Sequence, residues 1–430
     1  MEHRRRHLVA IGLYTAITAI FAITTASERL TAHTPFNHYA LLAEAWTQGR
    51  LDLGGPPPAY TGNNDFAVHD GKFYVSFPPF PAVLLVPMVK MAGSAERVRD
   101  GQLFLWLAGI GPAVLFLALE KLSARGRSRR SPRENLALAA LFAFGTVYWF
   151  TSVQGTVWFA AHVVGVALSA LYLYFAIDAE HPVLAGLTLG LAFATRPPMA
   201  LALPFFLYEV WRGARADRRP GPRLVGAHVP ALVGRLALFT LPAAAVLGVL
   251  LWHNQARFGD PLEFGHRMLA IGWRTRIEKW GLFSYHYLAR NLGVALAGLP
   301  FTRVPGVPFQ INAHGLALWV TTPIYAWALW PKRATGLFRV LALTAAAVAL
   351  PNLLYQNTGW IQFGYRFSND FALLLFMMLA VGGRRLSAAF WVAAAVAVVV
   401  NGFGAVSFQR AGYERWYFVD PTQRVLYQPD

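Results

Sequence analysis

Long apolar runs alternate with short polar stretches along this chain. A run of ~20 apolar residues predicts a helix that crosses a bilayer. Helices are predicted at residues 8–26, 101–122, 135–153, 157–177, 183–195, 198–211, 236–253, 314–330, 337–355, 371–383 and 386–404. The pattern therefore predicts an all-α polytopic membrane protein with about 11 transmembrane helices, in one integral membrane domain over residues 1–430.

Two of these runs, 183–195 and 198–211, are short, and the tripeptide Thr195-Arg196-Pro197 separates them. We expect two half-depth helices that meet inside the protein, as broken helices do in transporters. The first run follows Arg4–Arg6 and lacks a small-residue cleavage pattern. We therefore expect it to be a retained helix rather than a signal peptide.

Composition agrees with a membrane protein: 56% of residues are hydrophobic, 14% are charged, and the mean hydropathy is +0.40. A net charge of +17 would also suit a nucleic-acid-binding protein, but the location of the charge argues against one. The basic residues cluster at Arg4–Arg6, Ala124–Arg133, Arg212–Arg223, Lys332–Arg333 and Arg384–Arg385. All of these stretches are cytoplasmic if the N-terminus is cytoplasmic and the C-terminus outside, which is the positive-inside pattern. We expect a lipid bilayer, and no nucleic acid, as partner.

One further apolar stretch, FYVSFPPFPAVLLVP (Phe73–Pro87), is not expected to span the membrane. Its prolines disfavour a spanning helix, and counting it as a span would move both long basic stretches outside. We expect a short helix at the outer interface, with Phe73, Tyr74, Phe77 and Phe80 near the headgroups and Lys90 in water. The outer segments are then residues 27–100, 254–313 and 356–370, and a tail at 405–430. Their aromatic content predicts ordered, functional loops.

The first outer loop carries candidate residues in two places. Residues 37–53 have an apolar stripe at helical spacing that ends at Gly49, which predicts an amphipathic interfacial helix. His38 and Glu44 on this helix are either site residues or solvated groups that face the headgroups. Asp65 lies in a turn-rich stretch farther along. A carboxylate beside aromatic residues at a membrane surface is partly desolvated, which suits it to accept a proton from a hydroxyl.

Arg196, in ATRPPM (Ala194–Met199), is the sharpest signal within the membrane. A charged side chain between apolar segments costs on the order of 3 kcal/mol, so it is expected to have a partner or to face a water-filled site. Arginine binds phosphate in a bidentate manner, so Arg196 is a candidate phosphate ligand. The alternative is that it caps the end of the preceding helix.

The other outer segments place arginines beside aromatic rings, at Arg257, Arg267 and Arg366. Arg366 and Asp370 are four positions apart, so a structural ion pair is the alternative to a substrate-binding role. The chain has no cysteine, no GxxxxGK[ST] and no HExxH. Thiol, ATP-driven and zinc-protease chemistry therefore lack support. A divalent metal shared between the outer loops is left open.

The order of elements resembles the polyprenyl-phosphate-sugar-dependent glycosyltransferases of the GT-C fold, which include protein O-mannosyltransferases and the aminoarabinose transferase of lipid A. The resemblance rests on a first helix followed by a long outer loop, a loop helix like AEAWTQGRLDL, an interfacial helix with a proline pair, and the stretch GLTLGLAFATRPPM. NQARFGDPLEFGHR and GWIQFGYRFSND also resemble bacterial members. The resemblance implies a multi-pass protein of the bacterial cytoplasmic (inner) membrane that uses a polyprenyl-phosphate-linked sugar on the outer face.

The chain departs from this family at two places. The family carries an acidic residue or an Asp-Glu pair where this chain has Asn37-His38, and relatives often have Glu-Lys where it has Ser76-Phe77. The catalytic base therefore cannot be assigned by position. The candidates in the right loop are, in order, Asp65, Glu44 and Glu28.

The sequence thus predicts an inverting glycosyltransferase that passes a sugar to a lipid, glycan or protein acceptor. Asp65 or Glu44 would deprotonate the acceptor, and Arg196 and Arg366 would stabilise the leaving phosphate. Lys72, His38 and Arg257 complete the predicted substrate-binding set. Two other classes remain open, namely a transporter or flippase for a lipid-linked glycan and a catalytically inactive scaffold of the same fold.

Overall fold

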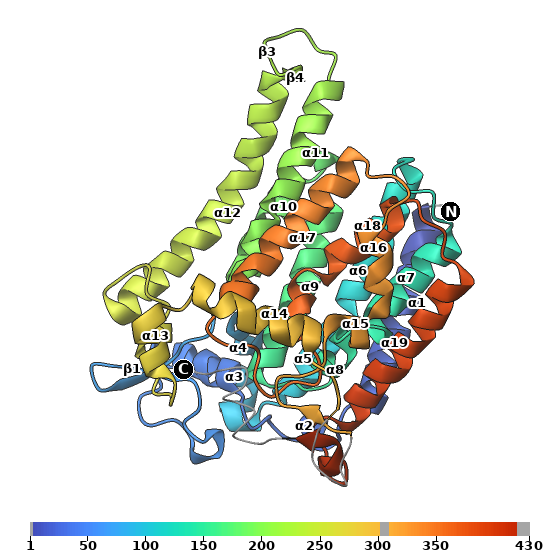
Figure 1. Ribbon diagram of the computed structural model, residues 1–430. Coiled ribbons are helices and arrows are strands. Elements are labelled where there is room, and N and C mark those ends of the chain that lie inside the picture. Colours follow the sequence, from blue (N-terminus) through green and yellow to red (C-terminus); the bar gives the residue numbers. More distant parts are fainter. Residues whose placement is uncertain (1–2, 302–308, 419–430) are drawn as a thin grey trace.

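The computed structural model describes residues 3–301 and 309–418. Parts of the predicted second outer loop (254–313) and outer tail (405–430) therefore lie outside the described residues. The described chain is mainly helical, with short strand pairs in its loops (Figure 1). An all-α polytopic fold was predicted from the sequence, and the structure confirms it.

The elements follow the chain in this order. The helices are α1 His3–Thr24, α2 Glu28–Thr31, α3 His38–Thr47, α4 Phe80–Ala92, α5 Asp100–Ala108, α6 Ile110–Ala124, α7 Pro132–Phe144, α8 Tyr148–Ser152, α9 Val157–Ala176, α10 Pro182–Phe193, α11 Leu203–Ala216, α12 Val229–Phe258, α13 Arg274–Trp280, α14 Leu288–Ala297, α15 Leu318–Thr321, α16 Ala326–Leu329, α17 Gly336–Leu354, α18 Ala372–Val381 and α19 Ala388–Ser407. The strands are β1 Phe66–His69, β2 Lys72–Val75, β3 Arg223–Leu224, β4 Ala227–His228, β5 Ile311–Asn312 and β6 Tyr417–Phe418. The pairs β1–β2 and β3–β4 are antiparallel hairpins, and β5–β6 is parallel.

Within the described ranges, six helical stretches are long and apolar enough to cross a membrane. They are Arg4–Thr24, Asp100–Ala124, Val157–Ala179, Val229–Phe258, Gly336–Leu354 and Ala388–Ser407. Each matches a predicted apolar run. The helices α4, α10 and α18 are apolar but shorter, at 13, 12 and 10 residues. The total of about 11 spans therefore stays a prediction.

The predicted helix 101–122 divides at Gly109 into α5 and α6, and two further predicted helices are wrong as single elements. Residues 135–153 form α7 and α8, because Thr146 interrupts them: its hydroxyl accepts a hydrogen bond from the backbone amide of Tyr148 at 3.1 Å, which starts the new helix. Residues 314–330 form α15, a 3₁₀ turn and α16, because Pro323 has no amide hydrogen to continue α15. The side-chain amide of Asn401 donates to the carbonyl of Thr321 at 2.7 Å and so satisfies a group left free by the break.

The proline-rich stretch forms a strand followed by a short helix. Asp70-Gly71 makes the turn of the β1–β2 hairpin, so Phe73 and Tyr74 lie in β2 rather than in an interfacial helix as predicted. The helix begins only at Phe80 and has 13 residues, which is short of the ~20 that span a bilayer. This length agrees with the prediction that the stretch does not cross the membrane.

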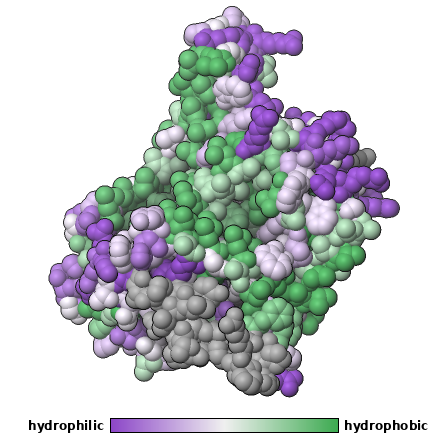
Figure 2. Space-filling model, viewed as in Figure 1, coloured by the Kyte–Doolittle hydropathy of each residue, from purple (hydrophilic) through white to green (hydrophobic). Residues whose placement is uncertain are grey.

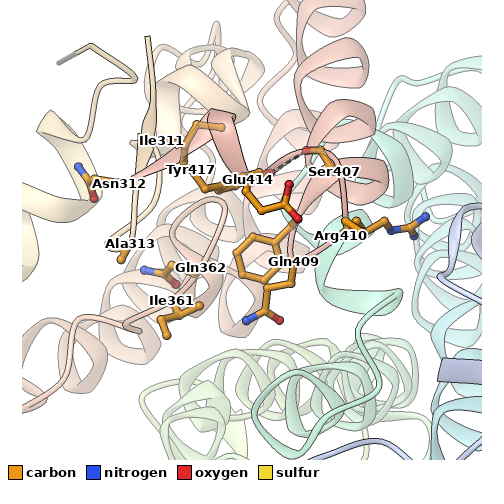
Figure 3. Close-up of a pocket in the computed structure, with 12 residues that line it drawn as sticks. Ile311, Asn312, Ala313, Ile361, Gln362, Ser407, Gln409, Arg410, Glu414 and Tyr417 are labelled. Atoms are coloured by element: carbon orange, nitrogen blue, oxygen red, sulfur yellow. Dashed lines mark hydrogen bonds between the residues drawn. The ribbon is translucent and has the colours of Figure 1, made fainter. Parts of the chain in front are cut away.

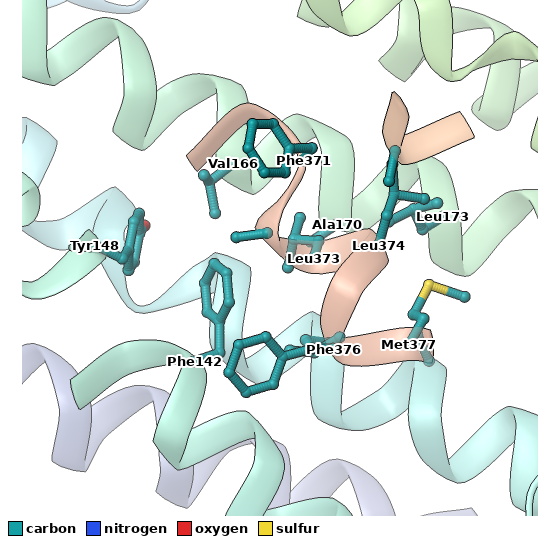
Figure 4. Close-up of a cluster of buried hydrophobic side chains, with 14 of the residues drawn as sticks. Phe142, Tyr148, Val166, Ala170, Leu173, Phe371, Leu373, Leu374, Phe376 and Met377 are labelled. Carbon is teal, nitrogen blue, oxygen red and sulfur yellow. The ribbon is translucent and has the colours of Figure 1, made fainter. Parts of the chain in front are cut away.

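The core surrounds α9, which is largely buried. Side chains of α7, α8, α9 and α18 interlock there, with the rings of Phe142 and Phe376 edge to face at 5.5 Å (Figure 4). The predicted loop helix α3 also packs on protein: Tyr39, Leu42 and Ala43 are buried against α4. The two loop helices are thus part of a second packed cluster beside the bundle.

The predicted basic loops meet at one end of the molecule, the same end as the N-terminus (Figure 1). Arg6 lies 3.8 Å from Glu120 of α6, Arg130 donates to the carbonyl of Arg384, and the amide of Lys332 donates to the carbonyl of Gly382. Hydrophobic side chains cover the face over α12, α10 and α17, and hydrophilic ones gather at its two ends (Figure 2). This arrangement is that of a multi-pass membrane protein.

Candidate functional site

The break between α10 and α11 places Arg196 at the centre of the candidate site. The chain leaves α10 at Phe193, and Pro197 then begins a 3₁₀ helix, Pro197–Ala202, that leads into α11. The carbonyl of Ala194 accepts a hydrogen bond from the amide of Phe80, the first residue of α4, at 3.0 Å. A backbone hydrogen bond therefore links the proline-rich stretch FPPFP directly to ATRPPM.

Arg196 is held by Asp370 in a buried network. Its Nη2 donates to Asp370 Oδ2 at 2.6 Å and its Nε donates to Asp370 Oδ1 at 3.1 Å. His162 Nδ1 lies 3.1 Å from Asp370 Oδ1, and Asn352 Nδ2 donates to Asp370 Oδ2 at 3.0 Å. The Asp370 side chain is fully buried, whereas that of Arg196 is 17% exposed. The network therefore fixes a guanidinium that still has an accessible surface.

Both structural alternatives for the arginines are answered by this network. The guanidinium of Arg196 bonds to Asp370 and Asn352 rather than to the carbonyls that end α10, so it is not a helix cap. The alternative pairing of Arg366 with Asp370 is also wrong, since Asp370 pairs with Arg196 and His162. The expectation that an intramembrane arginine has a partner is confirmed.

Arg366 is a buried cation whose contacts are neutral. Its Nη1 donates to the carbonyls of Gly359 at 2.9 Å and Trp360 at 3.4 Å, and its guanidinium lies over the rings of Phe159 and Phe367 at 5.2 and 5.5 Å. Within the described chain, no carboxylate lies within ion-pair distance of it. Burial, followed by the charge of Arg196, lowers the pKa of Arg366 to about 9. Arg196 and Arg366 thus lie within electrostatic reach of each other, and Asp370 balances the charge of Arg196.

Asp65 lies within electrostatic reach of Arg366, directly before β1 of the β1–β2 hairpin. Its Oδ2 accepts a hydrogen bond from Trp158 Nε1 of α9 at 2.8 Å. Burial raises the pKa of Asp65, and the bond from Trp158 and the charge of Arg366 act in the opposite sense. The result is a carboxylate more basic than one in water, within electrostatic reach of Arg366.

The backbone of Asp65 is held in the left-handed region, at φ +62°. Ser76 donates to its carbonyl at 3.2 Å, and His38 Nε2 bonds the carbonyl of the preceding residue, Asn64, at 2.8 Å. His38 is fully buried and stacks on Phe66, and this burial lowers its pKa to about 4. A neutral ring cannot supply positive charge to a phosphate, so His38 supports the turn that carries Asp65. The alternative of a solvated, headgroup-facing His38 is wrong.

The remaining predicted site residues make no hydrogen bond or ion pair with Asp65 within the described ranges, and their roles stay predictions. Glu44 is half-buried on α3, within electrostatic reach of Tyr60. Glu28 is exposed on α2 and close to Arg410 in the C-terminal segment. Lys72 is 60% exposed and lies 3.8 Å from Asp52. Arg257 is buried and donates to the carbonyl of Val75 at 2.9 Å, which ties the end of α12 to β2.

The roles of four residues could not be read from the sequence, namely Asp370, His162, Asn352 and Trp158. Asp370 and Arg196 are 174 positions apart, and His162 lies within an apolar helix where it gave no motif. The one available signal was the presence of polar residues within apolar runs, which in a membrane protein marks a functional or structural network.

A cavity of about 420 Å³ opens next to the loop that carries Arg366 (Figure 3). Ile311, Ile361, Gln362, Phe408, Glu414 and Tyr417 line it. Gln362 Oε1 accepts from the backbone amide of Arg366 at 3.0 Å, so one side chain borders both the cavity and the arginine loop. Among the described residues, no group of three or more His, Asp or Glu is arranged to hold a metal ion.

Comparison with known proteins gives matches at the level of structure. No protein-family model matches the chain, and neither does any curated protein sequence. Among solved structures, it is similar to the oligosaccharyltransferase of Archaeoglobus fulgidus in its apo form, at 14% identity and a TM-score of 0.46, over 93% of this chain and 56% of that one. The same enzyme, AglB, in complex with an inhibitory peptide and a dolichol-phosphate matches at 15% identity and a TM-score of 0.46, over 96% and 56%.

A third match is ArnT from Cupriavidus metallidurans bound to undecaprenyl phosphate, at 14% identity and a TM-score of 0.46, over 90% of this chain and 63% of that one. The chain thus spans 56% to 63% of the length of these structures. At this level of similarity the matches assign neither a family nor an activity to the chain.

Proposed function

We propose that this protein is a membrane glycosyltransferase that transfers a sugar from a polyprenyl-phosphate carrier to a hydroxyl group of a lipid, glycan or protein acceptor. The reaction would take place at the end of the molecule where the first outer loop, the Arg196 break and the Arg366 loop converge. The proposal rests on the residues of this site and agrees with the family resemblance of the sequence.

The observation that carries the proposal is Arg366. A buried guanidinium whose direct partners are carbonyl oxygens and ring faces has its charge incompletely compensated. Arg196 lies close enough to lower the pKa of Arg366 further, but its own charge is balanced by Asp370, so the unbalanced charge of the site is that of Arg366. An anion entering beside Arg366 would complete this arrangement, and a phosphate matches the planar donors of both arginines.

Asp65 supplies the base that such a transfer needs. Its carboxylate would accept the proton of the acceptor hydroxyl while the acceptor oxygen attacks the anomeric carbon. The new C–O bond forms as the bond from the anomeric carbon to the phosphate oxygen breaks, so the configuration inverts. The electron pair leaves with the polyprenyl phosphate, where Arg366 and Arg196 would stabilise the added negative charge. No other reactant is required.

The transfer is tested with the full chain purified in detergent and a panel of labelled polyprenyl-phosphate sugars. Asp65→Asn is expected to lower the rate by 10²–10⁴-fold, as removal of a general base does. Arg366→Gln is expected to weaken the binding of polyprenyl phosphate itself, measured by native mass spectrometry. Asp52→Asn is the matched control, since Asp52 is a carboxylate of the same loop that pairs with exposed Lys72.

The outcomes separate this function from the other classes. Wild-type rates for Asp65→Asn would remove Asp65 from the site, and Glu44 and then Glu28 would be tested in turn. A protein that binds polyprenyl phosphate through Arg366 but transfers none of the sugars, in detergent or in vesicles, would contradict the enzyme proposal. Movement of the lipid-linked sugar across vesicles without transfer would then identify a flippase.

A further inference from the structure

A second charged site lies at the opposite end of the molecule from β1, where the N-terminus and the basic loops meet (Figure 1). A cavity of about 350 Å³ opens there between the start of α7 and the end of α18. Arg129, Arg130, Glu134, Gly383, Arg385 and Leu386 line it. Neither the proposed transfer nor the network around Asp370 uses any of these residues.

Arg130 forms the rigid floor of this cavity. Its side chain is only 7% exposed, and Nη1 lies 3.1 Å from Glu134 Oε1. Nη2 donates to the carbonyls of Leu379 at 2.8 Å and Arg384 at 2.5 Å. Within the described ranges, its buried Nε has no hydrogen-bond partner. A buried donor without a partner is costly, and an acceptor that reached it from the cavity would remove that cost.

Arg129 and Arg385 stand at the mouth of the cavity. Both are exposed, and neither has a hydrogen-bond or ion-pair partner among residues 3–301 and 309–418. The one lining carboxylate, Glu134, already pairs with Arg130. It also accepts hydrogen bonds from the amide and hydroxyl of Ser131, with which it caps the start of α7. Three arginines against one glutamate leave the cavity with a net charge of about +2. The cavity therefore attracts an anion with several acceptor oxygens.

The surroundings favour a lipid as the source of that anion. Leu386 lines the cavity, and α19 begins two positions later at Ala388. Along α19, Trp391, Val392 and Val399 are 42%, 66% and 71% exposed, as expected of a lipid-facing helix. A phosphate in the cavity would place attached acyl chains along this apolar face. Basic pockets between membrane helices bind anionic headgroups in this manner.

We propose that this cavity binds the phosphate headgroup of an anionic phospholipid in the leaflet at the N-terminal end of the molecule. Arg129 and Arg385 would bind the phosphate oxygens from the mouth, and Arg130 from the floor. The site is separate from the proposed transfer of sugar, because it lies at the other end of the bundle and shares no residue with it.

The test uses the full chain purified in detergent, with phosphatidylglycerol, phosphatidylcholine or inorganic phosphate added. Two quantities are measured: the midpoint of thermal unfolding and the lipid adducts seen by native mass spectrometry. Phosphatidylglycerol is expected to raise the midpoint and to form adducts at lower concentration than phosphatidylcholine. In Arg129→Gln/Arg385→Gln the apparent affinity for phosphatidylglycerol is expected to fall by at least about tenfold, since two charge-assisted hydrogen bonds are lost. Arg385→Gln alone, a change on an exposed loop, is the second variant if the double variant does not fold.

The matched control is Arg5→Gln/Arg218→Gln, which also removes two exposed arginines from the same end of the molecule. This control is expected to keep the affinity of the wild type. An equal loss in the control would show that diffuse positive charge, and not the cavity, attracts the lipid. Equal affinity in wild type and Arg129→Gln/Arg385→Gln, or an equal effect of inorganic phosphate alone, would likewise overturn the lipid site.

Discussion

Trp158 controls the protonation of Asp65 in the proposed reaction. Its indole N–H stabilises the charged carboxylate and so lowers a pKa that burial raises. Trp158→Phe removes this hydrogen bond, so the pKa of Asp65 rises further. A base must be deprotonated to act, and the acid limb of the activity profile is therefore expected to move to higher pH. Transfer rates measured between pH 5 and 9 check this.

The control for this change is Trp106→Phe. Trp106 is 60% exposed on α5 and does not contact Asp65, so its pH profile should match that of the wild type. An unchanged acid limb in Trp158→Phe, at a measurable rate, would show that Asp65 is not the group whose protonation limits the reaction.

Asp370 is the residue on which the geometry of Arg196 depends. Asp370→Asn would leave Arg196 without an anion in a buried setting, and removal of one member of a buried ion pair typically costs about 3–5 kcal/mol. The double variant Arg196→Gln/Asp370→Asn removes both charges. We expect it to unfold at a higher temperature than Asp370→Asn alone, because the uncompensated cation is gone.

Thermal unfolding of the single and double variants in detergent measures this coupling. If the two substitutions lower the unfolding midpoint additively, Arg196 and Asp370 do not stabilise each other and the network does not position the arginine. Polyprenyl-phosphate binding by Asp370→Asn, measured on the fraction that folds, should weaken together with the loss of stability.

At the scale of elements, α9 determines where the break between α10 and α11 can lie. Gly165 of α9 faces Arg196: a Cβ placed there would lie 3.0 Å from Arg196 Cγ and 2.8 Å from Met199 Cε. Gly165→Val is therefore expected to displace the Arg196 turn and to weaken binding of polyprenyl phosphate by about tenfold, a loss equivalent to ~1.4 kcal/mol. Isothermal titration or native mass spectrometry measures the affinity.

Gly248→Val on α12 is the matched control, since a Cβ there would meet no heavy atom within 4 Å. It should bind polyprenyl phosphate as the wild type does. Equal effects of both substitutions would mean that valine disturbs these helices generally, and the close approach of α9 to Arg196 would lose its functional meaning.

The helices also show why the fold was predicted from the sequence only in part. The long spanning helices were found because each is apolar over about the length that crosses a bilayer, whether it faces lipid, as α12 does, or is buried, as α9 is. The break at Arg196 was found because proline and a charge coincide there. The breaks at Thr146 and Pro323 were missed, since the residues around each are apolar and the runs look continuous by hydropathy. The Thr146 break depends on a local bond to the amide of Tyr148, and Asn401 satisfies the carbonyl freed before Pro323.

The candidate site was predictable only where a single stretch carries its own signal. Asp65, Arg196 and Arg366 each stand out against aromatic or apolar neighbours in the sequence. Asp370 was considered only as an alternative partner of Arg366, because helical spacing says nothing about a partner 174 positions away. Ser76 and His38, where the chain departs from the resembled family, prove to hold the turn that carries Asp65.

At the scale of the whole molecule, α12 connects the two ends. Its 30 residues give a length of about 45 Å, more than the ~30 Å hydrocarbon core of a bilayer. It starts next to the β3–β4 hairpin, which projects with α11 beyond the rest of the body (Figure 1), and Arg257 near its other end binds β2. The hairpin and the β1–β2 loop should therefore be exposed on opposite sides of the membrane.

The absence of cysteine makes this arrangement directly testable, because a single introduced cysteine has no background. Lys72→Cys, in β2, is expected to react with a membrane-impermeant maleimide in intact cells, and Arg218→Cys, before the β3–β4 hairpin, only after the cells are opened. This result would place the basic loops inside, as the charge pattern predicts. Labelling of Arg218→Cys in intact cells, or a reporter fused near Gly126 that appears outside, would reverse the orientation. Asp65 and Arg366 would then lie on the cytoplasmic face, where a carrier that holds its sugar on the outer face could not reach them.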